Sequence, residues 1–372
     1  MKSVAMAIAM ACLAPVSAFA DPFDLTRTDK TLVLDAVISH LETDYVEPGA
    51  GAAAADQLRN DIAQGVFEPI DDADAFATRL SDALQTYTDD GHLNVEYVAT
   101  PLAEDDPRDE AFSEEQMELW YGRHLNFGVE RAERLEGNVG YLDLRVFAPI
   151  DMGGETIVAA LTMLANTDAL IIDLRKNGGG IGDTADLVAS YLFDGGRQPL
   201  TGVYDRPSDT LTQRHTQAYV PGTRFGGEKP VYVLLSSKTF SAAEALAYNL
   251  QALDRATLVG ETSGGGAHPF EYLRVHPHFV LWSVTAKSIH PITGTNWQSV
   301  GVKPDIETEA GAALQAALDD LATIKAQPRR PMASADPAFF PARPDRPRRP
   351  VTPRPPLFRY RALRQQTASL CP

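Results

Sequence analysis

Cysteine is scarce in this chain, and long hydrophobic segments are absent. The 372 residues include two cysteines, Cys12 and Cys371. Residues 1–20 have the features of a secretory signal: a positive start, a short apolar run and an A-x-A cleavage site. Removal of this signal would leave Cys371 alone, so no internal disulfide is expected and stability must come from a core. Because no run approaches the roughly 18 apolar residues of a membrane helix, the sequence predicts an exported protein, periplasmic or extracellular, with no integral membrane segment.

The usual motifs of metal and cofactor sites are missing too. The sequence has no H-E-x-x-H, and a single remaining cysteine excludes thiolate clusters. His276 and His278 make only a weak metal pair. The glycines at 178–180 do not fit a dinucleotide fingerprint, because the last glycine of G-x-G-x-x-G would fall on Asp183, and no P-loop Gly-Lys-Ser/Thr follows them. We therefore expect no cofactor and no metal site.

The formal charge of −17 hides two regions of opposite sign. Residues 328–372 contain ten arginines against two acidic residues, so they carry +8 and the remainder of the chain carries −25. An acidic body argues against nucleic acid as a partner. The basic segment is also rich in proline, which predicts a disordered or polyproline-like tail. Two interpretations stay open: the tail contacts an anionic surface such as a membrane or cell wall, or it is solvated and has no function.

Helical periodicity dominates the first part of the chain. Apolar residues recur at helical spacing in residues 32–41, 52–62 and 74–87, and Asp74 is the expected N-cap of the last segment. These segments predict a small helical cap. Residues 101–118 are acidic and polar and are expected to form a surface linker.

A second pattern begins near residue 139, where short apolar strands alternate with helices. Strands are expected at residues 140–147, 169–174, 231–235 and 257–259, and helices at residues 155–164, 184–192 and 242–253. This alternation implies parallel pairing and an α/β core. Further strands are expected near the sheet edge at residues 272–287. The predicted domains are a signal peptide (1–20), a helical cap with its acidic linker (21–120), a core (121–325) and a basic tail (326–372).

Ser241 lies where an expected strand turns into an expected helix. Its hydroxyl would project from a strand end, and the following N–H would point from a helix N-terminus, which is a suitable place to form and stabilise an oxyanion. The spacing from Ser241 to Glu244 is also that of a capping box, which satisfies the first N–H groups of a helix. Capping is the commoner use of such a pattern, and from these residues alone both interpretations stay open.

A nucleophilic serine needs a base. No S-x-x-K motif is present, and the next lysine after the serine, Lys287, falls on an expected strand. Among the eight histidines, His92 differs because it ends the helical unit just before a strand, at a turn that could face a cleft. The glycine loop at 178–180 provides either backbone N–H groups for an oxyanion or a plain strand-to-helix turn.

Six segments together carry a family resemblance. They are TDDGHL (88–93), GNVGYL (137–142), DLRKNGGG (173–180), SKTFSAAE (237–244), GETSGGGAHP (260–269) and TGTNWQSVGVKPDI (293–306). In this order they resemble the tail-specific or C-terminal processing serine peptidase superfamily, and more closely its branch with interphotoreceptor retinoid-binding protein and the tricorn core. The resemblance covers residues 30–307.

This resemblance implies a crotonase/ClpP-like α/β core behind the helical cap, with Ser241 as nucleophile and His92 as general base. The N–H of Ala242 and an N–H of Gly178 or Gly179 would form the oxyanion hole. The implied activity is that of an exported serine-type peptidase, which hydrolyses peptide bonds in peptides or unfolded proteins. The alternative is a non-catalytic or weakly active protein that binds an apolar ligand on the same fold.

The chain departs from the family pattern at several places. Gly266 stands where the Ser–Lys branch has its lysine, Gly91 stands where the tricorn core has a serine, and the span from His92 to the core is too short for a PDZ module. Relatives commonly have Glu where this chain has Gln298, which we place in the catalytic set. An amide can hydrogen-bond but cannot stabilise a cation by charge, so Gln298→Glu should raise turnover if the missing charge matters.

Overall fold

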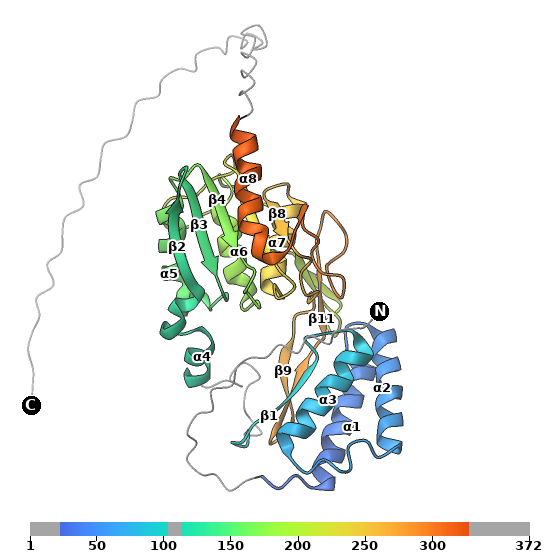
Figure 1. Ribbon diagram of the computed structural model, residues 1–372. Coiled ribbons are helices and arrows are strands. Elements are labelled where there is room, and N and C mark those ends of the chain that lie inside the picture. The colour runs from blue at the N-terminus through green and yellow to red at the C-terminus, as the bar shows by residue number, and fades with distance from the viewer. Residues whose placement is uncertain (1–22, 103–113, 327–372) are drawn as a thin grey trace, which may run out of the picture. The chain divides into compact units, whose positions relative to one another are not determined.

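The computed structural model describes residues 23–102 and 114–326 (Figure 1). The helices are α1 (Arg27–Thr43), α2 (Pro48–Ala63), α3 (Ala73–Thr88), α4 (Glu114–Tyr121), α5 (Ile150–Leu164), α6 (Gly182–Tyr191), α7 (Ala242–Ala252) and α8 (Ala313–Ala326). The strands are β1 (Asn94–Tyr97), β2 (Val129–Leu135), β3 (Val139–Leu144), β4 (Ala169–Asp173), β5 (Gly202–Asp205), β6 (Thr210–Thr212), β7 (Val231–Leu235), β8 (Thr257–Gly260), β9 (Glu271–His276), β10 (Phe279–Ser283), β11 (Ala286–Ile289) and β12 (Ile306–Glu307). The predicted α/β core with an N-terminal helical region is confirmed.

The N-terminal region starts with three helices whose ends are set by short-range hydrogen bonds. Thr26 and Asp29 form a capping box at the start of α1. At α3 the N-cap is Asp72, whose side chain accepts the Ala75 N–H at 2.8 Å, so the expectation of Asp74 as cap is wrong by two residues. After α3, Asp89 adopts a left-handed conformation with φ of 53°, which ends the helix and turns the chain toward β1.

Strands from the second half of the chain complete the N-terminal region. β1 pairs antiparallel with β10, and β10 pairs with β9, in a three-stranded sheet. Leu93 and Val95 beside α1–α3 share a hydrophobic core with Phe279 and Leu281 of β10. The expectation that residues 272–287 lie at the edge of the main sheet is therefore wrong: β9 and β10 join the N-terminal region, and β11 pairs with β5 in another sheet.

The main sheet has the strand order β12-β8-β7-β4-β3-β2. All neighbours pair in parallel except β2, which pairs antiparallel with β3. Helices α5, α6 and α7 contribute to the apolar core on one face of the sheet, and α8 covers the other face. The edge strand β2 is not among the expected strands, because only Val129 of its sequence VERAERL is buried and the strand lacks an apolar face.

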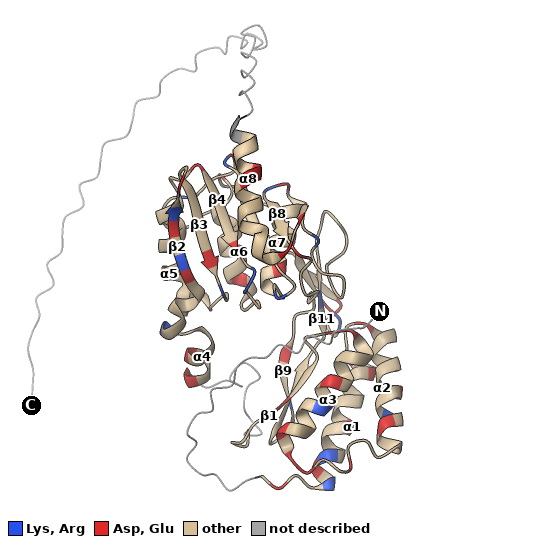
Figure 2. Cartoon of the chain, viewed as in Figure 1, with Lys and Arg blue, Asp and Glu red and all other residues tan. Residues whose placement is uncertain are grey.

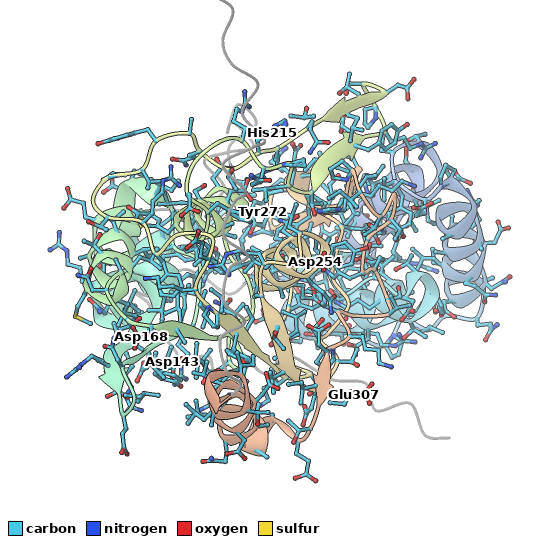
Figure 3. All side chains as sticks on the ribbon, turned by 90° about the horizontal axis from the view of Figure 1, so that it is seen from above. Asp143, Asp168, His215, Asp254, Tyr272 and Glu307 are labelled. Carbon is cyan, nitrogen blue, oxygen red and sulfur yellow. The ribbon has the colours of Figure 1, made fainter. Side chains whose placement is uncertain are left out.

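Three neighbouring parallel strands, β4, β7 and β8, end at the same edge of the sheet. Their carboxyl ends lead into residues 174–181, 236–241 and 261–270. Loops that leave such an edge are the usual place for a ligand in an open α/β sheet. In Figure 3, Asp143 labels β3, which lies next to the edge strand β2, and Glu307 labels the opposite edge strand β12.

Acidic side chains are spread over the helices and strands rather than gathered on one element (Figure 2). Within residues 23–102 and 114–326, no helix is long and apolar enough to cross a membrane. Part of the expected linker is ordered, because Glu114 begins helix α4. The predicted signal peptide at 1–20 and the basic tail after α8 lie outside the described residues.

Candidate active site

Ser241 sits on a strained turn between β7 and α7. We call residues 236–242 the nucleophile turn. Ser241 has φ of 54° and ψ of −122°, a backbone conformation that side-chain-bearing residues rarely adopt. A serine held on a sharp strand-to-helix turn presents its hydroxyl outward, as in a nucleophile elbow.

The side chain of Glu244, on the first turn of α7, holds the nucleophile turn in place. Its fully buried carboxylate accepts four hydrogen bonds, from the Ser241 N–H (2.8 Å), the Ser263 hydroxyl (2.6 Å), the Gly265 N–H (2.6 Å) and the Gly266 N–H (2.8 Å). Burial raises the pKa of Glu244 to about 7, although the hydrogen bonds oppose this shift. The expected capping contact from Glu244 back to Ser241 is therefore present, and the same carboxylate also ties down the loop after β8.

The glycine loop after β4 packs directly against Ser241. Gly179 has φ of 113°, and a Cβ at this position would lie 2.7 Å from the Ser241 Cβ, so glycine is required there. The Gly179 N–H donates to the Asn177 side chain at 2.8 Å. Within the described residues, the N–H groups of Gly178 and Ala242 donate to no protein acceptor. Of the two glycines predicted for an oxyanion hole, Gly178 thus keeps a free donor and Gly179 does not.

His92 lies on the turn between α3 and β1, residues 89–93, which we call the histidine turn. Its ring is buried between Phe240 and Phe270, with ring centroids 4.7 and 5.4 Å away. Burial lowers the pKa of His92 to about 4, opposed by the charge of Asp90 and reinforced by His268. The imidazole is therefore neutral over most of the pH range, as a general base must be.

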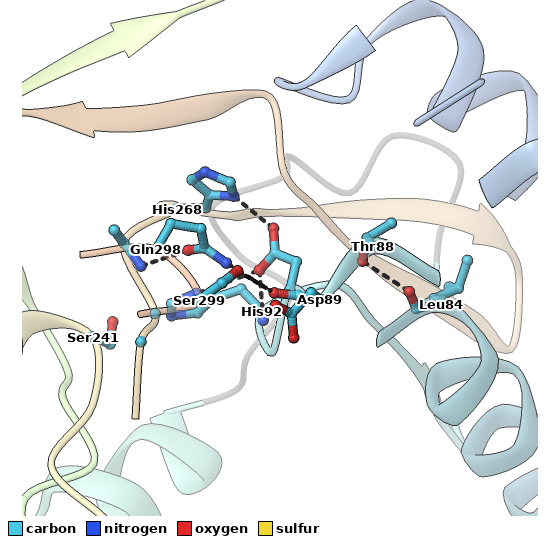
Figure 4. A network of polar contacts seen from close by, with 12 residues as sticks. Leu84, Thr88, Asp89, His92, Ser241, His268, Gln298 and Ser299 are labelled. Carbon is cyan, nitrogen blue, oxygen red and sulfur yellow. Dashed lines mark hydrogen bonds and ion pairs between the residues drawn. The ribbon is translucent and has the colours of Figure 1, made fainter. Parts of the chain in front are cut away.

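The two turns meet through Phe240 and Gly266 rather than through a direct hydrogen bond. Figure 4 shows Ser241 and His92 with no bond between them, and none joins these residues within the described part of the chain. A Cβ on Gly266 would lie 2.7 Å from the His92 Cε1 and would clash with the Phe240 ring. The space in front of position 266, which the Ser–Lys branch would fill with its lysine, is thus occupied by His92 and Phe240.

Asp90 and His268 form a polar network that the sequence analysis left without a function. The carboxylate of Asp90 is buried; its Oδ2 lies 2.7 Å from the His268 Nδ1 and accepts a hydrogen bond from the Tyr45 hydroxyl at 3.0 Å. Both residues belong to segments that carry the family resemblance, and this membership is the one feature of the sequence that could have marked them as functional. Their pairing across 178 positions could not be read from local patterns.

Gln298 connects the core to the histidine turn, and among the described residues it hydrogen-bonds to neither Ser241 nor His92. Its Oε1 accepts the Ala267 N–H at 2.8 Å, and its Nε2 donates to the Asp89 carbonyl at 3.3 Å (Figure 4). The hydroxyl of Ser299 donates to the same carbonyl at 2.8 Å. The structure therefore makes Gln298 a bridge between the core loop and the histidine turn.

Comparison with known proteins agrees with this architecture. Residues 138–308 match the family described as "Peptidase family S41", and residues 25–119 match the "N-terminal domain of Peptidase_S41 in eukaryotic IRBP". The two matches cover the core and the N-terminal region in the expected order. The chain belongs to peptidase family S41.

The individual relatives have low sequence identity to this chain. The chain is 28% identical over 180 residues to a carboxy-terminal-processing protease of Bartonella bacilliformis, covering 47% of this chain and 40% of the relative. It is 26% identical over 136 residues to the carboxy-terminal processing protease CtpA of Bacillus subtilis, covering 36% and 27%. The chain therefore spans less than half the length of these curated relatives. A putative peptidase from Parabacteroides merdae has the same fold, with a TM-score of 0.56, 18% identity and coverage of 78% of this chain and 96% of that one.

Proposed function

We propose that this protein is a serine-type peptidase in which Ser241 is the nucleophile and His92 the general base. The observation that carries the proposal is the nucleophile turn itself. Ser241 is held in a strained conformation directly before Ala242 and against the loop of Gly178 and Gly179, and among the described residues the N–H groups of Ala242 and Gly178 find no acceptor. Strain at a polar residue next to free backbone donors is the arrangement expected for attack on a carbonyl and capture of the resulting oxyanion.

The reaction follows from these groups. As the Ser241 oxygen attacks the carbonyl carbon of a peptide bond, its proton passes to the His92 ring, and the N–H groups of Gly178 and Ala242 hold the negative oxygen. His92 then gives the proton to the leaving amine nitrogen, and the C–N bond breaks. Water attacks the acyl ester, loses a proton to His92 and releases the acid, while the Ser241 oxygen takes that proton back.

The position of His92 supports its role as the base, because its ring packs on the ring of Phe240, the residue preceding the nucleophile. Its hydrogen bond to Ser241 would form on closure around a substrate, since catalytic hydrogen bonds are often long without one. Gly266 supports this assignment, because the volume that a side chain would occupy there is given over to His92.

Labelling with a fluorophosphonate probe tests the proposal. Wild-type protein should be labelled, and Ser241→Ala should abolish labelling while the melting temperature changes by a few degrees at most. His92→Gln should slow labelling by about 10²-fold or more, the usual contribution of a general base. Folded wild-type protein that resists the probe would refute the nucleophile assignment.

A second candidate is a protein that binds an apolar ligand on the same fold. It is favoured by the aromatic column around His92, which continues from Phe270 to Trp282 at a centroid distance of 4.7 Å, and by the missing Ser241–His92 hydrogen bond. An apolar fluorescent ligand that binds with micromolar affinity to unlabelled, folded protein would select this function.

Export is the remaining part of the proposal. The secretory signal expected at residues 1–20 places the protein in the periplasm or outside the cell, where peptides and unfolded proteins would be its substrates. N-terminal sequencing of the mature protein should begin at Asp21, directly after the A-x-A site. The basic tail, with its expected contact to anionic surfaces, stays a prediction.

A further inference from the structure

Asp90 is a buried carboxylate that the mechanism above does not use. Its Oδ1 accepts the backbone N–H of His92 at 3.0 Å, and its Oδ2 is held by His268 and by the Tyr45 hydroxyl. Burial alone would raise the pKa of Asp90, but the hydrogen bond and charge of His268, together with those of His92, keep the pKa below its ordinary value. Asp90 is therefore a buried negative charge whose Oδ2 is held by two side chains and whose Oδ1 is held by one backbone N–H.

The Oδ1 oxygen of Asp90 lies close to the imidazole ring of His92. The Nδ1 of His92 is buried without a hydrogen-bond partner and lies 3.9 Å from Asp90 Oδ1. Within the described part of the chain no other carboxylate lies within 4.0 Å of this ring. A movement of about 1 Å would bring the two atoms to hydrogen-bond distance.

This contact becomes necessary when His92 takes a proton. An imidazolium carries a donor on each nitrogen, and a buried donor without an acceptor costs about 1–3 kcal/mol. Asp90 supplies both an acceptor and a compensating charge, without taking the proton itself. His268, which comes from the core loop, fixes the direction from which Asp90 acts.

We infer that Asp90 is the carboxylate partner of His92, and that His268 is a positioning residue that holds Asp90 against the histidine turn. The inference rests on the proposed function, because it gives the general base its third member. Both residues act through His92 and neither touches the substrate.

The pH dependence of labelling distinguishes this arrangement from a merely structural one. The titratable groups that act on His92 are Asp90, on its own turn, and His268, on the core loop; Phe240 and Phe270 are uncharged. The base works when neutral, so labelling is lost as the pH falls through the pKa of His92. Asp90 favours the charged form, so its removal moves the midpoint of this loss to lower pH.

The experiment measures fluorophosphonate labelling of the full chain from about pH 2.5 to pH 8, with the melting temperature at each pH, because the pKa of His92 is about 4 and the expected shift is downward. Asp90→Asn should lower the plateau rate about 10²-fold or more and shift the acid midpoint downward. His268→Phe should slow labelling about tenfold, and His268→Asn, which keeps a donor near the position of Nδ1, should recover most of the rate. Asp89→Asn makes the same charge change on an exposed neighbour and should match wild type.

An NMR titration of the His92 ring separates the two ways of failing. If wild type is not labelled at Ser241, the proposed function fails, and the titration alone decides the inference. A lower His92 pKa in Asp90→Asn than in wild type supports the pairing in either case. An unchanged His92 pKa, or a lower plateau with an unmoved acid midpoint, would overturn it.

Discussion

The nucleophile turn and the histidine turn differ in how their polar groups are satisfied. At the nucleophile turn, one buried carboxylate accepts four hydrogen bonds from two segments, the turn itself and the loop after β8, and Ser241 is locked at an unusual φ. At the histidine turn, the functional ring has a buried nitrogen without a partner and is held by aromatic packing. The first is fixed before any substrate arrives, and the second can still adjust.

The difference follows from where the residues come from. The nucleophile turn and its supports lie on loops at one edge of the main sheet and on the first turn of α7, so the core that folds the sheet also builds the turn. The histidine turn belongs to the N-terminal region and reaches the core through a few contacts, among them His268 with Asp90 and Gln298 with Asp89. A general base on such an element can be moved into position by substrate.

Among substitutions that test this difference between the two turns, Gly266→Ala is expected to have the largest effect on labelling and stability. The added methyl group would enter the space of Phe240 and His92, which form the only described ring contact between the two turns. Overpacking should cost about 1–3 kcal/mol of stability, and displacement of His92 should slow probe labelling about 10²-fold. Labelling kinetics and thermal melting together check this result.

Gly311→Ala provides a matched control, since an added Cβ there would meet nothing within 4 Å. Gly311→Ala should change neither the labelling rate nor the melting temperature. Normal labelling of a folded Gly266→Ala protein would show that His92 does not depend on this space.

Glu244→Gln should loosen the nucleophile turn with a smaller effect. An amide in the place of the carboxylate turns one acceptor oxygen into a donor, so at least one of the three backbone N–H groups loses its partner. A buried donor left in this way costs about 1–3 kcal/mol. We expect a lower melting temperature and labelling slowed about tenfold.

Glu261→Gln is the comparison for this variant. Glu261 also accepts two backbone N–H groups, from Ser237 at 3.2 Å and Ala310 at 3.0 Å, but it is partly exposed, so water can replace them. Its substitution should cost under about 1 kcal/mol. Equal losses in both variants would contradict the view that burial makes Glu244 important.

The pH dependence of stability gives Glu244 a second signature. The pKa of Glu244 is about 7 in the folded protein, above its ordinary value of 4.5, so between these pH values the folded state binds more protons than the unfolded chain. The Glu244 contribution to the free energy of unfolding therefore falls as pH rises from 4.5 to 7. Glu244→Gln should remove this fall, as measured by denaturant unfolding across that range.

The sequence predicted well whatever depends on neighbouring residues. The apolar runs of β4 and β7 and the Ser241-x-x-Glu244 cap are local patterns, and the structure has them at the expected places. The placement of Asp74 as a cap failed because Asp72 has an equally suitable side chain two residues earlier. Local patterns thus locate elements but do not choose between adjacent candidates.

Contacts between distant segments were beyond local reasoning. The pairing of β1 with β10 depends on tertiary packing. The alternation of apolar residues in 272–287 predicts strands but does not indicate which strand they pair with. The same holds for Asp90 and His268, whose residue types fit many environments. The edge strand β2 was missed for another reason, because a strand with a single buried residue needs no apolar pattern.

A small effect is expected from Gln298→Glu, and it has the opposite sign from the one that the family pattern suggests. Gln298 satisfies a donor and an acceptor at once, the Ala267 N–H and the Asp89 carbonyl. A glutamate could keep the first contact but would turn a carboxylate oxygen toward the second, where it repels the carbonyl. The histidine turn would then lose one of its ties to the core, and labelling should slow by up to about tenfold, or 1.4 kcal/mol.

Ser299→Ala removes the other hydrogen bond to the Asp89 carbonyl without adding charge and should cost less. Faster labelling in Gln298→Glu would instead mean that a charge at this position serves His92 directly, and that the histidine turn needs an anion more than it needs this bridge.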